Sequence, residues 1–175
     1  MASLGVSVQA IAGGELRQAL RSGAIDAAEW VAPYDDLNLG LPEVADFYYY
    51  PGWWDTSSSA EVQLNKREYD GLPEFYRQVI QAAAFKANML MAARYDTLNP
   101  QALATIAADA NVRILPFPDD LMLAAREVSD ALLEELAAAD ADFMTLFQSW
   151  NAYRQSATAW FALGEASTLN FAAPT

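Results

Sequence analysis

The sequence predicts an α/β fold that is rich in helix and contains a small mixed sheet. Short β-branched or aromatic runs are concentrated before Asn65, and long helical patterns dominate after Pro73. Alanine is frequent, whereas glycine and proline number eight each, a composition that favours helices joined by a minority of turns. A chain of 175 residues is long enough for one domain with a sizeable core.

The first 65 residues alternate between short strands and short helices. Four runs of β-branched, aromatic or alternating residues predict strands, at 6–12, 25–31, 47–50 and 60–65. Helices or single helical turns are expected between them, at 15–22, 34–40 and 42–46. Gly23 follows the first of these helices, at a position where a left-handed residue is favoured.

A long helix is expected from Pro73 to about Leu98. Proline suits the first turn, because it needs no amide hydrogen there, and Glu74 lies at the positive end of the helix dipole. Asn99 and Pro100 then predict a stop and a restart, because asparagine accepts hydrogen bonds from free backbone amides and proline has no amide hydrogen to donate.

The remainder of the chain is also mainly helical. A short strand is expected at 111–117, followed by a helix that begins at Asp119 and breaks weakly near Ala139. The last helix is expected at 143–163, where Gly164 stops it, and the tail beyond is expected to lack regular structure.

Composition removes several classes of function. The chain has no histidine and no cysteine, which excludes histidine acid–base chemistry, thiol nucleophiles, disulfides and the usual zinc sites within it. The formal charge of −13 argues against nucleic acid and anionic membranes as partners, because both need a basic surface. No apolar run is long enough to span a membrane, and the start of the chain lacks a signal-peptide pattern.

An acidic and aromatic stretch at 25–55 is the strongest functional feature of the sequence. It holds three of the five tryptophans and four of the eight tyrosines, and it contains no lysine or arginine. An anionic cluster beside apolar rings is costly to bury without a partner. Either a cation binds there, or a basic side chain from elsewhere in the fold reaches in.

Glu29 and Asp55 are the candidate ligands within this stretch. They end two of the expected strands, where carboxylates commonly line a cleft, and with backbone carbonyls they form an all-oxygen environment that suits Na⁺ or Ca²⁺. Trp30 and Trp53 would wall such a site, and Tyr34 would donate its hydroxyl to a polar ligand. Two other interpretations stay open. The acids are solvated loop residues beside an aromatic core, or they form the acid–base pair of an enzyme, which requires a raised carboxyl pKa.

Four stretches carry a family resemblance, and they read IAGGELRQALRSGAIDAAEWVAPYDD, LPEVADFYYYPGWW, EYDGLPE and RILPF. They resemble the substrate-binding proteins of TRAP transporters, the DctP-type family, and especially receptors for 2-oxo acids or lactate. The likeness covers most of the chain but only the carboxy-terminal half of such proteins. It implies part of a two-lobed periplasmic-binding-protein-like fold with a long C-terminal helix. Residues 1–27 and 68–175 would form the second lobe and terminal helices, and 28–67 would belong to the first lobe.

The resemblance implies a periplasmic receptor rather than an enzyme. Such a receptor binds a small 2-oxo or 2-hydroxy monocarboxylate together with Na⁺ or Ca²⁺ and delivers it to TRAP membrane permease subunits. By the family motifs, Glu29, the backbone oxygen of Trp30 and Asp55 would bind the metal, while Trp30, Tyr34 and Asp55 would contact the substrate. Asp55 is one methylene shorter than the glutamate that is common at this position.

The resemblance also implies that part of the binding site lies outside this chain. The arginine that pairs with the substrate carboxylate and a metal-binding glutamine belong to the half that the chain does not match. The chain alone is therefore expected to bind keto acids weakly or not at all.

The aromatic helix expected at 143–163 carries two alternatives. Its large rings form an ordinary buried stripe, or they dock on a second subunit; the resemblance favours a homodimer, because the terminal helix swaps between subunits in some relatives. Exposed apolar surface would also promote self-association. The alternative function for the whole chain is a stand-alone helical interaction module that has lost ligand binding.

Overall fold

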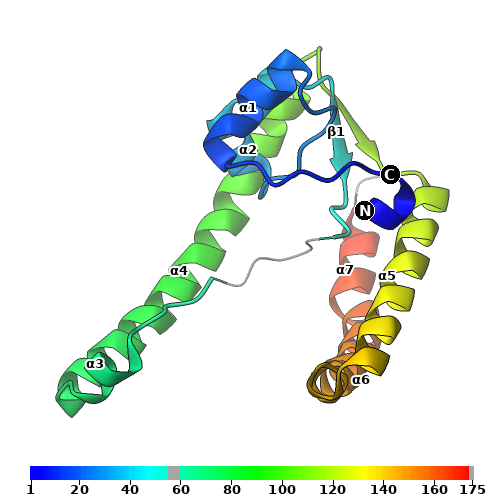
Figure 1. Ribbon diagram of the computed structural model, residues 1–175. Coiled ribbons are helices and arrows are strands. Elements are labelled where there is room, and N and C mark those ends of the chain that lie inside the picture. The colour runs from blue at the N-terminus through cyan, green and yellow to red at the C-terminus, as the bar shows by residue number, and fades with distance from the viewer. Residues whose placement is uncertain (55–59, 174–175) are drawn as a thin grey trace. The chain divides into compact units, whose positions relative to one another are not determined.

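A computed structural model describes residues 1–54 and 60–173 (Figure 1). The chain divides into two compact units. One unit comprises Val8–Pro118, and the other combines Met1–Ser7 with Asp119–Thr175.

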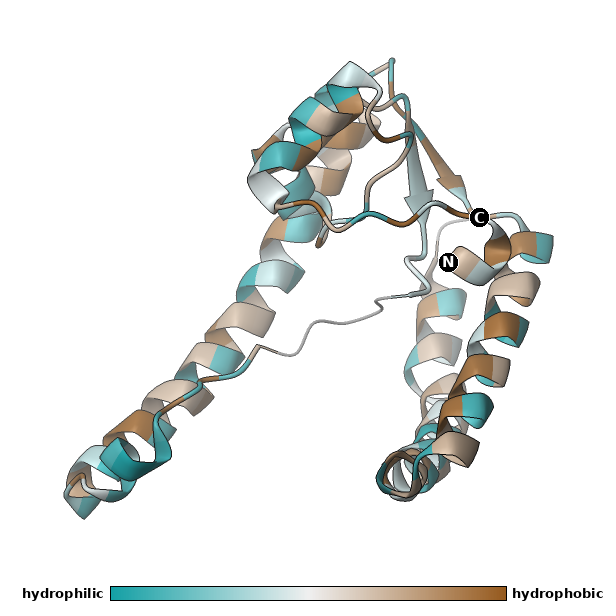
Figure 2. Ribbon diagram, viewed as in Figure 1, coloured by the Kyte–Doolittle hydropathy of each residue, from teal (hydrophilic) through white to brown (hydrophobic). Residues whose placement is uncertain are grey.

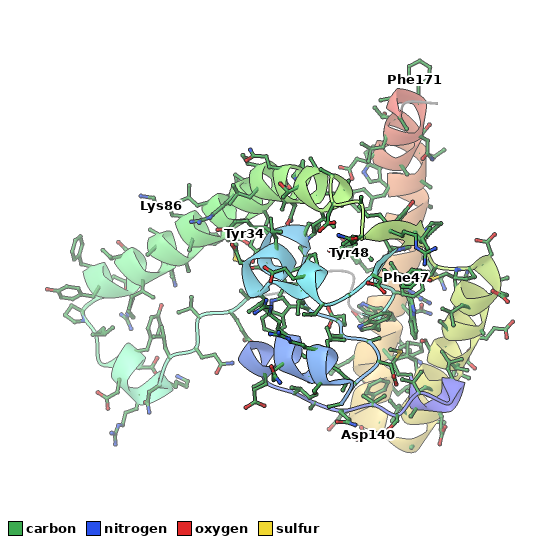
Figure 3. The ribbon with its side chains drawn as sticks, turned by 90° about the horizontal axis from the view of Figure 1, so that it is seen from above. Tyr34, Phe47, Tyr48, Lys86, Asp140 and Phe171 are labelled. Atoms are coloured by element: carbon green, nitrogen blue, oxygen red, sulfur yellow. The ribbon has the colours of Figure 1, made fainter. Side chains whose placement is uncertain are left out.

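The unit formed by Val8–Pro118 is organised around one long helix, α4 (Glu74–Ala107). Helix α2 (Pro33–Leu39) packs against α4, and α1 (Gly13–Ser22) lies beside α2 (Figures 1 and 3). The short helix α3 (Lys66–Asp70) precedes α4, and the 3-10 turn η2 (Leu41–Glu43) follows α2 directly.

Within the described residues, the sheet of this unit consists of two parallel strands, β1 (Phe47–Tyr50) and β2 (Arg113–Pro116). The register pairs the first residue of β1 with the first of β2 and the last with the last. The buried apolar residues of the unit come from α1, η2, α4 and the residue before β2; they are Leu16, Leu41, Ala102, Ile106 and Val112. Ile106 is the largest side chain that is almost fully buried, with 1% of its surface exposed.

The other unit is helical. Its elements are η1 (Ala2–Leu4), α5 (Asp119–Ala139), α6 (Ala141–Leu163) and α7 (Glu165–Ala172). Asp140 separates α5 from α6 and caps α6, because its carboxylate accepts hydrogen bonds from the amides of Asp142 and Phe143 at 2.8 and 2.9 Å. This cap is the physical basis of the break predicted near Ala139.

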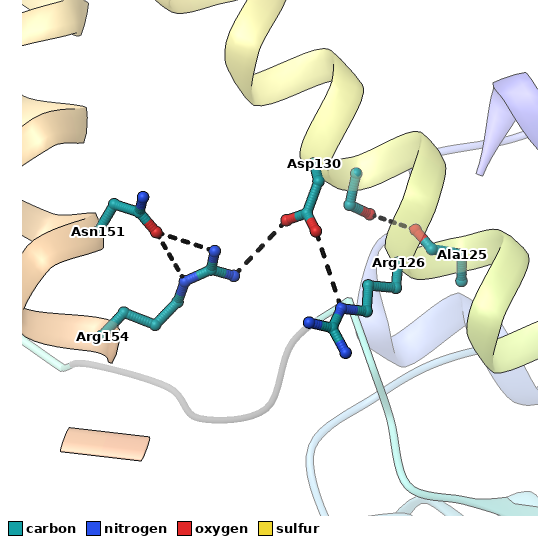
Figure 4. Close-up of polar contacts among 6 residues, drawn as sticks. Ala125, Arg126, Asp130, Asn151 and Arg154 are labelled. Atoms are coloured by element: carbon teal, nitrogen blue, oxygen red, sulfur yellow. Dashed lines mark hydrogen bonds and ion pairs between the residues drawn. The ribbon is translucent and has the colours of Figure 1, made fainter. Parts of the chain in front are cut away.

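A small charged network joins α5 to α6. Figure 4 shows Asp130 of α5 between Arg126, 3.8 Å away on the same helix, and Arg154 of α6, 3.6 Å away. Asn151 orients Arg154 by accepting two hydrogen bonds from its guanidinium group. All these charges are well exposed, so the network contributes little to stability.

Most predicted helices are confirmed. The predicted helix at 15–22 is α1, and Gly23 ends it in the left-handed conformation with φ 72°. The helices predicted from Asp119 and at 143–163 are α5 and α6. Of the predicted strands, 47–50 and 111–117 are confirmed as β1 and β2.

Three predicted strands are wrong, namely those at 6–12, 25–31 and 60–65. These residues have strand-like composition but no regular secondary structure. A strand needs a neighbour that completes its hydrogen-bond ladder, and across the described residues the ladder joins β1 to β2 alone. The tail prediction is also wrong, because α7 follows Gly164 directly.

The predicted stop at Leu98 is wrong as well. Helix α4 runs without interruption through Asn99 and Pro100 to Ala107. Pro100 removes one hydrogen bond of the helix. The turns that follow bury Ala102 and Ile106, and this burial offsets the loss.

The first part of α4 carries large apolar side chains that are exposed, including Phe75, Phe85 and Met89 at 68%, 74% and 70%. Figure 2 shows apolar residues along the whole of this helix. The α6–α7 region is similar, with Phe171 at the end of α7 93% exposed (Figure 3). In the parts of the chain that are described, no helix combines the length and hydropathy needed to cross a bilayer.

Candidate cation and carboxylate site

Glu29 and Trp30 lie in the connection between α1 and α2. Gly23 closes α1, and the chain then runs without regular structure to Pro33, the first residue of α2. Pro33 favours a helix start, because the first amide of a helix has no partner within it. Glu29 is exposed, whereas the Trp30 indole packs on Gly13 at the start of α1.

Tyr34, in the first turn of α2, is paired with Arg94 of α4. Nη2 of Arg94 donates a hydrogen bond to the Tyr34 hydroxyl oxygen at 3.3 Å, and the guanidinium carbon lies 5.9 Å from the centre of the ring. The hydrogen bond from Arg94, aided by Asn38, lowers the pKa of Tyr34 because both favour the phenolate. Since Arg94 donates to the oxygen, this hydrogen bond does not use the hydroxyl proton of Tyr34.

The start of α2 is held in place by α4. No side chain of its own N-cap residue, Ala32, bonds to it; instead Oδ1 of Asn99 accepts a hydrogen bond from the Tyr34 amide at 3.0 Å. The Tyr95 hydroxyl donates to Oδ2 of Asp35 at 2.7 Å, which raises the pKa of Tyr95. Asn99 therefore acts as a cap, as the sequence suggests, but it caps α2 rather than a helix that begins at its own position.

Replacing Asn99 by alanine is expected to lower the free energy of unfolding by about 1 kcal/mol, because the Tyr34 amide loses its acceptor. Asn99→Asp keeps an acceptor oxygen at the same place, so its free energy of unfolding should be close to that of the unmutated chain. Urea unfolding followed by circular dichroism measures both variants. Equal stability of Asn99→Ala and Asn99→Asp would show that this cap contributes nothing.

Asp36 joins α2 to β1 through a partly buried hydrogen bond. Its Oδ2 accepts from the Tyr48 hydroxyl at 2.5 Å, while Oδ1 is buried without a hydrogen-bond partner in the described part of the chain. Desolvation raises the pKa of Asp36, and the Tyr48 hydroxyl and the Val31 amide oppose this shift. The pKa of Tyr48 is raised mainly by burial and further by Asp36. The pair fixes β1, which leads into the Trp53 segment, against α2.

The aromatic residues after β1 belong largely to local packing. The Trp53 and Trp54 rings meet edge to face with centres 5.0 Å apart, and Trp54 lies 6.0 Å from Phe117 beyond β2. Phe117 also stacks on Tyr49 at 5.1 Å. Tyr49 and Trp54 therefore make ring contacts with Phe117, but both are exposed, so they do not form the aromatic core of the alternative interpretation.

Asp55 lies outside the described residues, so the predicted pairing of Glu29 with Asp55 stays a prediction. Within 1–54 and 60–173, no group of three or more acidic side chains gathers in a way that would hold a metal ion. Trp30 lies just before α2 and Tyr34 lies in its first turn. Trp30 contacts α1 at Gly13, whereas the Tyr34 amide is bound by Asn99 of α4.

Basic side chains do reach into the acidic and aromatic stretch. Arg17 of α1 pairs with Glu43, Arg94 of α4 with Tyr34, and Arg113 of β2 lies over the Phe47 ring at 4.2 Å. Sequence reasoning missed all three partners, because they lie far from their targets in the chain. One signal for Arg94 was present: it begins a short polar and aromatic run, ending at Asn99, in an otherwise alanine-rich helix.

Comparison with known proteins gives a consistent picture. Residues 1–140 match the DctP family, described as bacterial extracellular solute-binding protein family 7. The monocarboxylate 2-oxoacid-binding periplasmic protein of Nostoc sp. strain PCC 7120 is 42% identical over 172 residues, which cover 98% of this chain and 47% of that protein. The chain thus spans about half the length of the curated relative that it matches.

Solved structures of TRAP transporter solute-binding proteins share the fold. One from Bordetella bronchiseptica RB50, a mixed-occupancy dimer with calcium and picolinate in one site, is 36% identical with a TM-score of 0.91 over 97% of this chain and 50% of that one. One from Colwellia psychrerythraea with calcium and pyruvate is 32% identical, with a TM-score of 0.91, and the match covers 97% of this chain and 52% of that one. One from Pseudoalteromonas atlantica T6c with sodium and pyruvate is 31% identical, with a TM-score of 0.84, and the match covers 97% of this chain and 51% of that one.

Proposed function

Because the chain belongs to bacterial extracellular solute-binding protein family 7, we propose that it forms part of a periplasmic receptor for a small 2-oxo or 2-hydroxy monocarboxylate. The receptor binds this anion together with Na⁺ or Ca²⁺ and delivers it to TRAP permease subunits. The observation that carries the proposal is the identity of 42%, over nearly the whole chain, with a 2-oxoacid-binding periplasmic protein. The relatives are solute-binding proteins, and no catalytic role is assigned to this chain.

The proposed cation ligands are Glu29, the backbone carbonyl of Trp30 and Asp55. All three supply oxygen, which suits Na⁺ and Ca²⁺, and the chain has no histidine or cysteine to offer the usual nitrogen or thiolate ligands of transition metals. A bound cation would supply the positive charge that lets an organic anion approach these acids. The calcium and sodium in the related structures support this choice of ion.

Trp30, Tyr34 and Asp55 are the proposed substrate contacts. Tyr34 is suited to the task, because Arg94 donates to its hydroxyl oxygen and leaves the hydroxyl proton for a carboxylate or keto oxygen of the ligand. The Trp30 indole would cover the ligand and exclude water from the charged groups. The assignment of 28–67 to one lobe, and of 1–27 and 68–175 to the other, remains part of this proposal.

The proposal is tested by tryptophan fluorescence of the full chain, titrated with pyruvate in Na⁺ and then in Ca²⁺. We expect a weak, saturable response that requires the cation, because the chain spans about half of its relatives. Glu29→Gln should weaken this response roughly tenfold, since it removes a charged metal ligand. Glu61→Gln is the matched control, an exposed glutamate outside the proposed site, and should respond like the unmutated chain.

If the fluorescence of the chain alone does not change with pyruvate, the titration is repeated after the chain is mixed with the amino-terminal half of the Nostoc relative. No cation-dependent response in either arm would overturn the proposal and favour a helical interaction module that does not bind ligand.

A homodimer through α6 is also proposed. It is consistent with the Bordetella relative, which is a dimer, and with exposed aromatic rings on α6 such as that of Tyr153, which is 72% exposed.

A further inference from the structure

The indole of Trp30 occupies the space in which any other residue at position 13 would place its side chain. A Cβ atom built on Gly13 would lie 2.4 Å from Cη2 of Trp30, and 2.8 and 2.9 Å from Cζ3 and Cζ2. Carbon atoms in favourable contact are about 3.5 to 4.0 Å apart. The ring can hold this position only because residue 13 has no side chain.

The backbone does not explain this glycine. The glycines with left-handed φ are Gly5, Gly23 and Gly40, so the conformation of Gly13 is open to any residue. Glycine lowers helix stability by about 1 kcal/mol relative to alanine, and Gly13 lies in the first turn of α1. Its neighbour Gly14 provides a direct contrast, because a Cβ there would meet nothing within 4 Å.

The connection that leads into α2 is consequently fixed at both ends. The Trp30 ring rests on α1 at Gly13, and the Tyr34 amide is bound to Asn99 of α4 at 3.0 Å. The side chain of Trp30 and its carbonyl oxygen belong to one residue of this short connection. A backbone shift that relieves a clash at the ring would therefore also turn the carbonyl that the proposed function places on the cation.

We propose that Gly13 is a positioning residue for the cation and carboxylate site. Its missing side chain seats the Trp30 indole, and the seated indole sets the Trp30 backbone oxygen beside Glu29. This inference rests on the proposed function for its effect on binding, whereas the seating itself is a property of the ligand-free chain. Gly13 touches neither cation nor substrate and acts through Trp30.

The test compares Gly13→Ala with Gly14→Ala in the full chain labelled with 5-fluorotryptophan. Fluorine NMR should give one resonance for each of the five tryptophans, and Trp30→Phe identifies the resonance of Trp30. We expect Gly13→Ala to shift that resonance in the absence of ligand and to weaken the cation-dependent pyruvate response roughly tenfold. Gly14→Ala should leave both unchanged and raise the thermal midpoint slightly.

The variant Gly13→Ala combined with Trp30→Phe separates a steric cause from a general defect. Phenylalanine is smaller than tryptophan and leaves room for a Cβ at position 13, so adding Gly13→Ala to Trp30→Phe should cost little further binding. This pair also keeps the test decisive if Gly13→Ala alone fails to fold.

Each failure has a distinct meaning. An unchanged Trp30 resonance in Gly13→Ala would overturn the seating. A shifted resonance with unchanged pyruvate binding would overturn the positioning role and leave the seating intact. Absence of any cation-dependent binding in the unmutated chain, alone or with the other half of the Nostoc relative, would overturn the proposed function and the positioning role together, while the resonance still decides the seating.

Discussion

Tyr48→Phe is expected to lower the free energy of unfolding by about 2 kcal/mol near pH 7, because it removes the hydroxyl that donates to the buried carboxylate of Asp36. Oδ1 of Asp36 already lacks a hydrogen-bond partner in the described residues, so the variant would leave this buried carboxylate without its side-chain donor, and only the opposing effect of the Val31 amide named above would remain. Urea unfolding gives the difference directly. Tyr49→Phe is the matched control. It makes the same change on the same strand at a residue that is 43% exposed, so it should lower the free energy of unfolding only slightly.

The pH dependence of this pair follows from the raised pKa of Asp36. Because the folded state raises this pKa above its usual value of 3.8, the folded chain binds the proton more tightly than the unfolded chain. Asp36 therefore contributes stability below about pH 3.8, and this contribution is lost as the pH rises through the folded pKa. Asp36→Asn does not titrate, so its stability relative to the unmutated chain should increase as the pH rises from about 3.8 through the raised pKa of the folded state.

Two results would contradict this account of the pair. The cost of Tyr48→Phe should shrink at low pH, where Asp36 is neutral and needs its donor less; a cost that does not change with pH would show that Asp36 is not the cause. A relative stability of Asp36→Asn that falls as the pH rises would show that Asp36 prefers its charged form in the fold.

Ile106→Ala is expected to lower the free energy of unfolding by about 3 kcal/mol, because it opens a cavity around a side chain that is only 1% exposed. Leu103 lies one turn earlier on α4 and is 39% exposed, so Leu103→Ala is the matched control and should cost well under half as much. Thermal and urea unfolding measure both. Equal costs would mean that the C-terminal part of α4 is not packed as described.

The loss at Ile106 should also spread to the site. Helix α4 carries Arg94 and Asn99, which hold Tyr34 in place, on the turns before Ile106. Loosening this end of α4 is therefore expected to reduce the pyruvate response more than Leu103→Ala does.

The question raised by the acidic and aromatic stretch has a partial answer in the fold. Arg17, Arg94 and Arg113 reach it from α1, α4 and β2. Two of them are directed at aromatic side chains and one at Glu43. The alternative in which basic side chains reach into the stretch is therefore confirmed for Tyr34, Glu43 and Phe47, and a cation at Glu29 and Asp55 stays a proposal.

Local signals were sufficient for most helices and for the family. Gly23 predicts its own left-handed helix end, and the motif around Glu29 and Trp30 predicts the family that residues 1–140 match. Such features depend on residues close together in the chain, where backbone sterics and capping decide the outcome. The same reasoning places α5 and α6, whose boundary is a capping aspartate, Asp140.

The strands could not be predicted in this way. The run at 25–31 is as strand-like as Phe47–Tyr50, yet only the second forms part of the sheet, because it finds β2 beside it. A strand is stabilised by a partner that is distant in sequence, and composition does not name that partner. The passage of α4 through Pro100 has the same cause, since distant packing around Ile106 outweighs a local stop signal.

By itself, the sequence determined most of the helices, the left-handed end of α1, the family and the chemistry of the proposed ligands, because these follow from residue type and short spacing. Only the tertiary structure decided which residues hold the segment around Trp30 and Tyr34: Asn99 caps α2 from another helix, Arg94 donates to the Tyr34 hydroxyl oxygen, and Gly13 makes room for Trp30. Each of these joins positions between 17 and 65 residues apart, and only folding brings such positions into contact.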